Sequence, residues 1–165
     1  MTDAFWGLAG ADWALLGAGF AAVLGGIGSA IGITIASAVV SGIVTEDGEK
    51  FGKLLPLAAM PATQGIYGFI SAVLVLFFFG IFDGEVGLSA AAGFKVFLAC
   101  MPVAFLCLVT AIYQGRTGAT AAGIVARRSE DSGKALIFPA LVETYAVLSL
   151  IVTVLMMLGL QTAYM

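Results

Sequence analysis

The sequence predicts an all-α membrane protein with four transmembrane helices. Of its 165 residues, 61% are hydrophobic and 10% are charged, whereas charged residues make up about 25% of an ordinary soluble domain. The mean hydropathy is +1.11. The apolar residues fall into four long segments separated by short polar turns, and about 20 apolar residues suffice to cross the hydrocarbon layer. We therefore expect a single membrane domain over residues 1–165.

Residues 10–82 are predicted to form a first helical hairpin. Its first segment, residues 13–44, is built from small residues, which let helix backbones approach closely in a membrane. The small residues that recur every four positions are Gly28, Gly32 and Ala36. The glycines of this segment lack the spacing and the preceding strand of a dinucleotide-binding loop, so we expect no nucleotide site here.

The second segment of this hairpin, residues 54–82, follows a polar turn at 45–53 and is bulkier. Pro61 lies in its first half and is expected to kink the helix, because proline lacks a backbone N–H. A hydroxyl, an amide and a phenol follow this proline closely. These side chains belong to Thr63, Gln64 and Tyr67. We interpret them as a polar cluster rather than as packing between helices.

Residues 88–161 are predicted to form a second hairpin that repeats the first in the same orientation. An acidic turn at 83–85 precedes it. It again joins a small-residue segment to a bulkier one through a charged turn. These three parts are residues 88–125, 127–134 and 135–160. The small residues spaced by four are Gly115, Ala119 and Gly123. Self-similarity of this kind is typical of membrane proteins built from repeats.

The two hairpins also match in their polar positions. A proline precedes the key polar residue by three or four positions in each bulky segment, Pro61 before Gln64 and Pro139 before Glu143. The first hairpin thus carries an amide where the second carries an acid. We expect a single intramembrane carboxylate for the four helices.

Glu143 is the only carboxylate in the segment 135–160. A charge at the centre of a membrane helix costs about 2.5–3.5 kcal/mol even on lenient insertion scales. Such an acid must face the protein interior, where a proton, a cation or a partner neutralises it, and it therefore marks a functional site. Counting along the helices from the charged turns places Gln64 and Gln114 at a similar depth, with Thr63 nearby.

This set of oxygen-bearing side chains is suited to a small hard cation. A proton needs only the carboxylate, whereas Na⁺ needs several oxygen atoms to replace its water. The additional neutral oxygens favour Na⁺, and H⁺ remains the alternative. The chain contains no histidine, and we expect no catalytic site in it. Cys100 and Cys107 are expected to be buried, unreactive thiols.

The basic residues predict the orientation in the cell membrane. Five of the seven flank the two charged turns, namely Lys50, Lys53, Arg127, Arg128 and Lys134. The positive-inside bias then makes the turns 45–53 and 127–134 cytoplasmic and puts both termini on the outer side. No basic residue precedes Lys50, so we expect no signal peptide. Lys95 can reach the interface, and Arg116 is expected to face away from Glu143.

Three motifs make the sequence similar to a known family. They are PATQGIYGF at 61–69, YQG at 113–115 and VETYA at 142–146. With the duplicated hairpin, they closely resemble the proteolipid ring subunit of the V-type (V/A-type) ATPases, most of all its sodium-translocating bacterial members. In those relatives, copies of the four-helix subunit form a membrane rotor ring, and each copy carries one ion on the acid of its last helix.

The resemblance implies a role for each residue of the site. The implied ion ligands are the carboxylate of Glu143, the side-chain oxygens of Thr63, Gln64 and Gln114, and the backbone carbonyl of Met60. Tyr67 would donate a hydrogen bond to Glu143 and hold it in place. The cargo would be Na⁺, with H⁺ as the alternative, and any ATP chemistry would belong to other subunits of the complex.

The resemblance also implies partners. They are identical copies in a ring, the lipid bilayer, a stator subunit with a membrane-embedded arginine, and central-stalk subunits at the cytoplasmic turns; no nucleic acid is expected. The small-residue segments would form the inner wall of the ring. Two alternatives remain at this point: a proton-translocating ring subunit of the same family, and a stand-alone four-helix transporter of a small solute.

Overall fold

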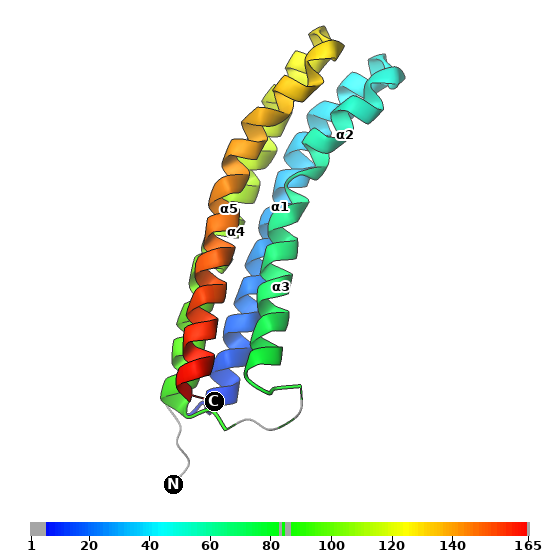
Figure 1. Ribbon diagram of the computed structural model, residues 1–165. Coiled ribbons are helices and arrows are strands. Elements are labelled where there is room, and N and C mark those ends of the chain that lie inside the picture. Colours follow the sequence, from blue (N-terminus) through cyan, green and yellow to red (C-terminus); the bar gives the residue numbers. More distant parts are fainter. Residues whose placement is uncertain (1–5, 83, 85–86, 165) are drawn as a thin grey trace.

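The computed structural model describes residues 6–82, 84 and 87–164, and no strand occurs among them. Two short 3₁₀ helices, η1 (Gly48–Lys50) and η2 (Ser129–Asp131), lie in the charged turns. The α-helices are α1 (Gly10–Glu46), α2 (Phe51–Ala59), α3 (Ala62–Phe78), α4 (Ala90–Arg127) and α5 (Ser132–Tyr164). All of them lie along one curved rod (Figure 1).

The two hairpins lie side by side in the same orientation. α1 and α4 form the most extensive helix contact and run parallel, while α3 packs on α1 and α5 packs on α4. Both charged turns lie at one end of the rod, which we name the turn end. The end of α5, the start of α1 and the described part of the connection between α3 and α4 lie at the other end, the terminal end (Figure 1).

Four helical stretches are long and apolar enough to cross a membrane. They are Gly10–Glu46, Gly48–Phe78, Ala90–Arg127 and Ser129–Tyr164. The predicted fold class, an all-α membrane protein with four spans, is therefore confirmed. The predicted segments 13–44 and 135–160 are shorter than α1 and α5, whereas α4 has the predicted length but is shifted by two residues from 88–125. α4 begins after Ser89, whose hydroxyl accepts a hydrogen bond from the Ala92 N–H at 3.2 Å and caps the helix.

The second predicted segment differs from the structure at both ends. The helix begins earlier than predicted, at Phe51, and α3 ends at Phe78 instead of continuing to residue 82. Gly80 has a φ of 65°, and the N–H of Ile81 bonds to the carbonyl of Leu76 at 3.0 Å. This is the arrangement with which glycine commonly ends a helix. The predicted acidic turn at 83–85 lies largely outside the described residues.

The contact between α1 and α4 depends on small residues. A Cβ atom on Gly32 would lie 2.2 Å from the carbonyl oxygen of Ala111, and one on Gly115 would lie 2.2 Å from the carbonyl oxygen of Gly32. All three residues of the predicted row on α1, Gly28, Gly32 and Ala36, are buried. The helix backbones therefore touch directly, as small residues allow in membrane proteins.

The small residues spaced by four on α4 do not all face a neighbouring helix. Gly115 is buried, but Gly123 is exposed and a Cβ there would meet no atom within 4 Å. The buried row instead continues through Gly118 and Ala122. A helix has about 3.6 residues per turn, so each step of four residues turns further round the axis, and Gly123 no longer faces α1.

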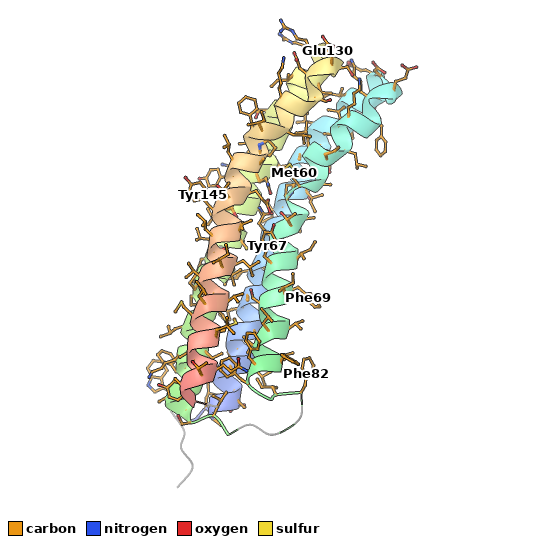
Figure 2. The ribbon with its side chains drawn as sticks, viewed as in Figure 1. Met60, Tyr67, Phe69, Phe82, Glu130 and Tyr145 are labelled. Atoms are coloured by element: carbon orange, nitrogen blue, oxygen red, sulfur yellow. The ribbon has the colours of Figure 1, made fainter. Side chains whose placement is uncertain are left out.

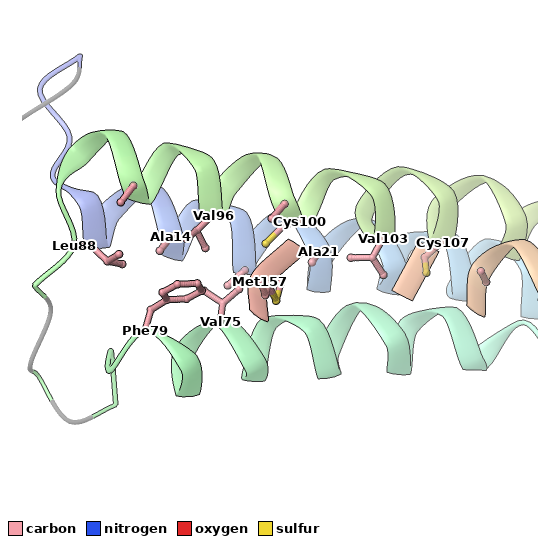
Figure 3. Packing of buried hydrophobic residues seen from close by; sticks show 14 residues of the cluster. Ala14, Ala21, Val75, Phe79, Leu88, Val96, Cys100, Val103, Cys107 and Met157 are labelled. Atoms are coloured by element: carbon pink, nitrogen blue, oxygen red, sulfur yellow. The ribbon is translucent and has the colours of Figure 1, made fainter. Parts of the chain in front are cut away.

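An apolar cluster fills the terminal end (Figure 3). Val75 and Phe79 at the end of α3 are fully buried in it together with Met157 from α5. Cys100 and Cys107 on α4 are also fully buried there, as predicted. The cluster joins helices from both hairpins, so each hairpin buries apolar surface of the other.

Lysines join the hairpins at the turn end. The ammonium of Lys50 donates to the carbonyl oxygen of Ala126 at 2.8 Å and pairs with Asp47 at 3.2 Å. Lys53 donates to the hydroxyl of Ser129 at 3.0 Å. The C-terminus of a helix such as α4 leaves carbonyl groups unpaired and carries a partial negative charge. A lysine from the first hairpin therefore stabilises the end of a helix in the second.

Replacing Gly32 by alanine is expected to destabilise the protein by about 1–3 kcal/mol, as overpacking of a tight contact does. The cause is the approach of the new Cβ to the Ala111 carbonyl oxygen, at 2.2 Å. The measurement is the thermal unfolding midpoint of the purified protein in mild detergent. Gly42→Ala is the matched control, because a Cβ at Gly42 on the same helix meets nothing within 4 Å. Equal midpoints for both variants would contradict the packing argument.

Candidate ion-binding site

The site lies beside a break in the second span. α2 ends at Ala59 and α3 begins at Ala62, so the predicted kink at Pro61 is a break between two helices. The carbonyl oxygen of Met60 accepts a hydrogen bond from the N–H of Thr63 at 3.1 Å and lies 2.9 Å from the hydroxyl oxygen of Thr63. Proline cannot continue the backbone hydrogen bonds, and the break turns this carbonyl towards polar side chains.

Glu143 projects from α5 towards this break and is partly buried. One carboxylate oxygen, Oε1, accepts a hydrogen bond from the hydroxyl of Tyr67 at 2.6 Å. The other, Oε2, accepts from the Thr63 hydroxyl at 2.8 Å, from the Gln114 amide at 2.6 Å and from the Gln64 amide at 3.2 Å. Four neutral donors from two other helices therefore hold the carboxylate.

The two glutamines are fully buried and bonded to each other. The amide nitrogen of Gln64 donates to the amide oxygen of Gln114 at 2.7 Å. The amide nitrogen of Gln114 also donates to the carbonyl oxygen of Pro139 at 3.1 Å. Every N–H of both amides thus has a partner, as buried polar groups require. This network connects the break in the first hairpin to α4 and α5 of the second.

Oxygen atoms crowd around the hydroxyl of Thr63. It lies within 2.9 Å of the Met60 carbonyl oxygen and of Glu143 Oε2, and 3.2 Å from the amide oxygen of Gln64. A hydroxyl has one proton to donate, and each of these three neighbours is an acceptor. Two of the three short oxygen–oxygen contacts therefore have no proton between the two atoms. These oxygens repel each other, and a positive charge among them would relieve the repulsion.

The structure brings together all six residues that the sequence analysis selected. Figure 2 labels two of them, Met60 and Tyr67, part-way along the rod at α2 and α3. The bonds described above connect them to the remaining four, which are Thr63, Gln64, Gln114 and Glu143. In the described ranges 6–82, 84 and 87–164, no group of three or more His, Cys, Asp or Glu residues could hold a metal. The donors here are one carboxylate and neutral oxygens.

Arg116 does not compete for Glu143. Its guanidinium lies over the ring of Tyr113, 5.4 Å from the ring centre, and the side chain is exposed. Residues two positions apart point in very different directions on a helix, so Gln114 faces the site while Arg116 faces away. The expected orientation of Arg116 is confirmed.

Sequence reasoning did not assign a role to Ser29. It lies on α1 and is buried, and its hydroxyl bonds to the backbone on both sides of the polar cluster of α3. In the sequence it belongs to a run of small residues, where a serine is typical of close helix packing. Its position three residues before Gly32 gives no signal of a polar role.

The family model for the C-subunit of ATP synthase matches the chain twice, at residues 16–75 and 97–156. The chain belongs to this family. The two matches cover the two predicted hairpins in turn, which confirms the duplication. The resemblance to the V/A-type proteolipid is confirmed as well, and the family is one that forms rings.

Two relatives of this proteolipid are similar over most of the chain. The V-type sodium ATPase subunit K of Enterococcus hirae is 36% identical over 137 residues, which are 83% of this chain and 85% of the relative. The A-type ATP synthase subunit K of Methanocaldococcus jannaschii is 39% identical over 136 residues, which are 82% of this chain and 57% of the relative. The chain is thus a membrane subunit of a V/A-type complex.

Replacing Tyr67 by phenylalanine is expected to speed the reaction of Glu143 with a hydrophobic carbodiimide several-fold. The hydroxyl holds Oε1 at 2.6 Å, and a hydrogen bond to a charged group contributes about 1.5–3 kcal/mol. Without it, the carboxyl group is freer to turn towards the reagent. The rate is measured in Na⁺-free buffer by mass spectrometry.

Tyr145→Phe is the control for this measurement. Tyr145 lies two residues from Glu143 on α5, and 61% of it is exposed on the surface of the chain; Figure 2 labels it on the side of α5 away from α3. Its loss should leave the rate unchanged. A Tyr67→Phe rate equal to that of the unmodified protein would show that the tyrosine does not restrain the acid.

Proposed function

We propose that this chain is the ion-carrying subunit of the membrane rotor ring of a V/A-type ATPase and that each copy binds one Na⁺ at Glu143. The observation that carries the proposal is the cluster of four oxygens centred on Thr63 Oγ1, which share one hydroxyl proton. Hard cations bind through oxygen atoms. The name of the Enterococcus hirae relative, a sodium ATPase subunit, supports the choice of ion.

The glutamines would complete the ligand set. As they lie, the amide nitrogens of Gln64 and Gln114 point at Glu143 Oε2. The terminal torsion of glutamine is broad and roughly two-fold, and a half-turn exchanges the amide oxygen and nitrogen. With the oxygens turned inwards, the proposed ligands are Glu143, Thr63, Gln64, Gln114 and the Met60 carbonyl. Tyr67 would keep its bond to the other carboxylate oxygen.

Binding would allow the site to face lipid while the ring turns. An unneutralised carboxylate in a membrane helix costs about 2.5–3.5 kcal/mol, whereas carboxylate and Na⁺ together carry no net charge. A loaded copy could therefore turn past lipid, and an empty one could not. Release would require a place where a positive charge competes with Na⁺ for Glu143, and a membrane-embedded arginine on a stator subunit would supply it.

The proposal includes the domain organisation and the orientation. The unit is one membrane domain with hairpins at 10–82 and 88–161, and identical copies form the ring, with the small-residue helices α1 and α4 on its inner side. The charged turns at 45–53 and 127–134 would face the cytoplasm, where central-stalk subunits would bind. Five of the seven basic residues flank these turns, which supports this orientation.

Two alternatives differ in what they require. A proton-translocating ring would need the carboxylate alone, and the crowded neutral oxygens then have no role. A stand-alone solute transporter would not be expected to belong to a ring-forming family, and the chain does belong to one. Na⁺ carried by a rotor ring therefore accounts for more of the structure than either alternative.

Protection of Glu143 from a carbodiimide by Na⁺ tests the proposal. The intact ring is titrated with NaCl at constant pH and ionic strength, and labelling is followed by mass spectrometry. Na⁺ is expected to slow labelling in a saturable manner, because a bound ion occupies the carboxylate. KCl serves as the control and should have no effect. Equal labelling in NaCl and KCl would overturn the Na⁺ assignment in favour of protons.

Replacing Thr63 by valine is expected to raise the Na⁺ concentration for half-protection about tenfold, which corresponds to ~1.4 kcal/mol. Valine has the same shape but removes the oxygen at the centre of the cluster. Thr144→Val is the matched control. Thr144 is adjacent to Glu143, but its hydroxyl bonds to its own helix at Leu141, 2.8 Å away. A shift of equal size in both variants would mean that Thr63 is not a ligand.

A further inference from the structure

Ser29 connects α1 to the first turn of α3. Its hydroxyl donates to the carbonyl oxygen of Pro61 at 2.6 Å and accepts a hydrogen bond from the N–H of Gly65 at 2.7 Å. These are the two backbone groups that a regular α-helix pairs with each other. The residue is 7% exposed, so water does not compete freely for either bond.

The surrounding residues leave room for a serine and little more. A Cβ on Gly65 would lie 3.0 Å from the Ser29 hydroxyl oxygen, and a Cβ on Gly25 would lie 2.8 Å from the carbonyl oxygen of Gln64. The backbones of α1 and α3 therefore touch at this level. Any movement of the hydroxyl would have to move the first turn of α3 with it.

This turn carries most of the neutral oxygens of the site. Thr63 and Gln64 lie between the two backbone groups that Ser29 bonds, and the Met60 carbonyl immediately precedes Pro61. The break at Pro61 removes a backbone donor from this region, and such breaks depend on neighbouring helices to satisfy the freed groups. Ser29 supplies bonds from a neighbouring helix at both ends of the turn.

The carboxylate also has support from outside this turn. Glu143 lies on α5 and is bonded to Thr63 and Gln64 of the turn, but also to Tyr67, from the next turn of α3, and to Gln114, from α4. Neither Tyr67 nor Gln114 is bonded to Ser29. The loss of the serine hydroxyl should therefore disturb the neutral oxygens more than the acid.

We propose that Ser29 is a positioning residue that sets the Met60, Thr63 and Gln64 oxygens for Na⁺ without touching the ion. This inference rests on the proposed function, because it assigns these oxygens to Na⁺. A proton bound at Glu143 would need none of these oxygens, so Ser29 should affect the binding of Na⁺ and not the binding of a proton. It contributes to Na⁺ affinity through the geometry of a backbone turn.

The test is the carbodiimide titration of intact rings carrying Ser29→Ala. The Na⁺ concentration for half-protection is expected to rise at least about fivefold, as the loss of one hydrogen bond of roughly 1 kcal/mol would produce. The labelling rate in Na⁺-free buffer should change by a smaller factor, because Tyr67 and Gln114 still hold the carboxylate. General loosening of the helices would change both quantities together. Ser149→Ala is the matched control, since Ser149 is also buried but its hydroxyl bonds to its own helix at Ala146, at 2.7 Å; neither quantity should change.

A second variant covers the case in which Ser29→Ala does not assemble. Gly65→Ala keeps the serine but displaces its hydroxyl, because the new Cβ would lie 3.0 Å from it, and the same selective loss of Na⁺ affinity is expected. If Na⁺ protects the unmodified ring and both assembled variants behave like it, the role of Ser29 is overturned and the Na⁺ site stands. If Na⁺ does not protect the unmodified ring, the proposed function itself fails.

Discussion

The hydrogen bond between Thr63 and Glu143 joins the two hairpins of this molecule at the candidate ion-binding site. It spans 80 residues of sequence and 2.8 Å of space, and it brings a hydroxyl from the first hairpin to an acid of the second. The energetic constraint behind it is the cost of a charged carboxylate in hydrocarbon. The surrounding helices place hydrogen-bond donors and oxygen atoms next to this acid, so that it is not in contact with lipid alone.

Close packing of the small-residue helices brings these groups within hydrogen-bonding distance of Glu143. α1 and α4 touch backbone to backbone at Gly32 and Gly115, which brings the break before α3 within reach of α5. Bulky side chains at these positions would separate the hairpins by more than a hydrogen bond can span. The lysine bonds at the turn end and the apolar cluster at the terminal end then hold the hairpins together on either side of the site.

Much of this arrangement could be predicted from the sequence, since a membrane restricts what a chain can do. Hydropathy gave four spans, and counting residues from the charged turns placed Gln64, Gln114 and Glu143 at one depth. Met60 was assigned only through the family resemblance, because a backbone carbonyl carries no signal in the sequence. The small residues 115, 119 and 123 do not form one contact row, since spacing alone does not show where a helix rotates away from its neighbour. Ser29 has no assignable role until its distances to α3 are known.

The partial burial of Glu143 decides how the carboxylate can be approached. Its bonds run to α3 and α4, and the remainder of the side chain lies at the flank of the single chain. Under the proposed function, an ion would therefore reach Glu143 from the side and would not pass between the four spans. No channel along the axis of the chain would be needed, and neighbouring subunits would form the walls of the path.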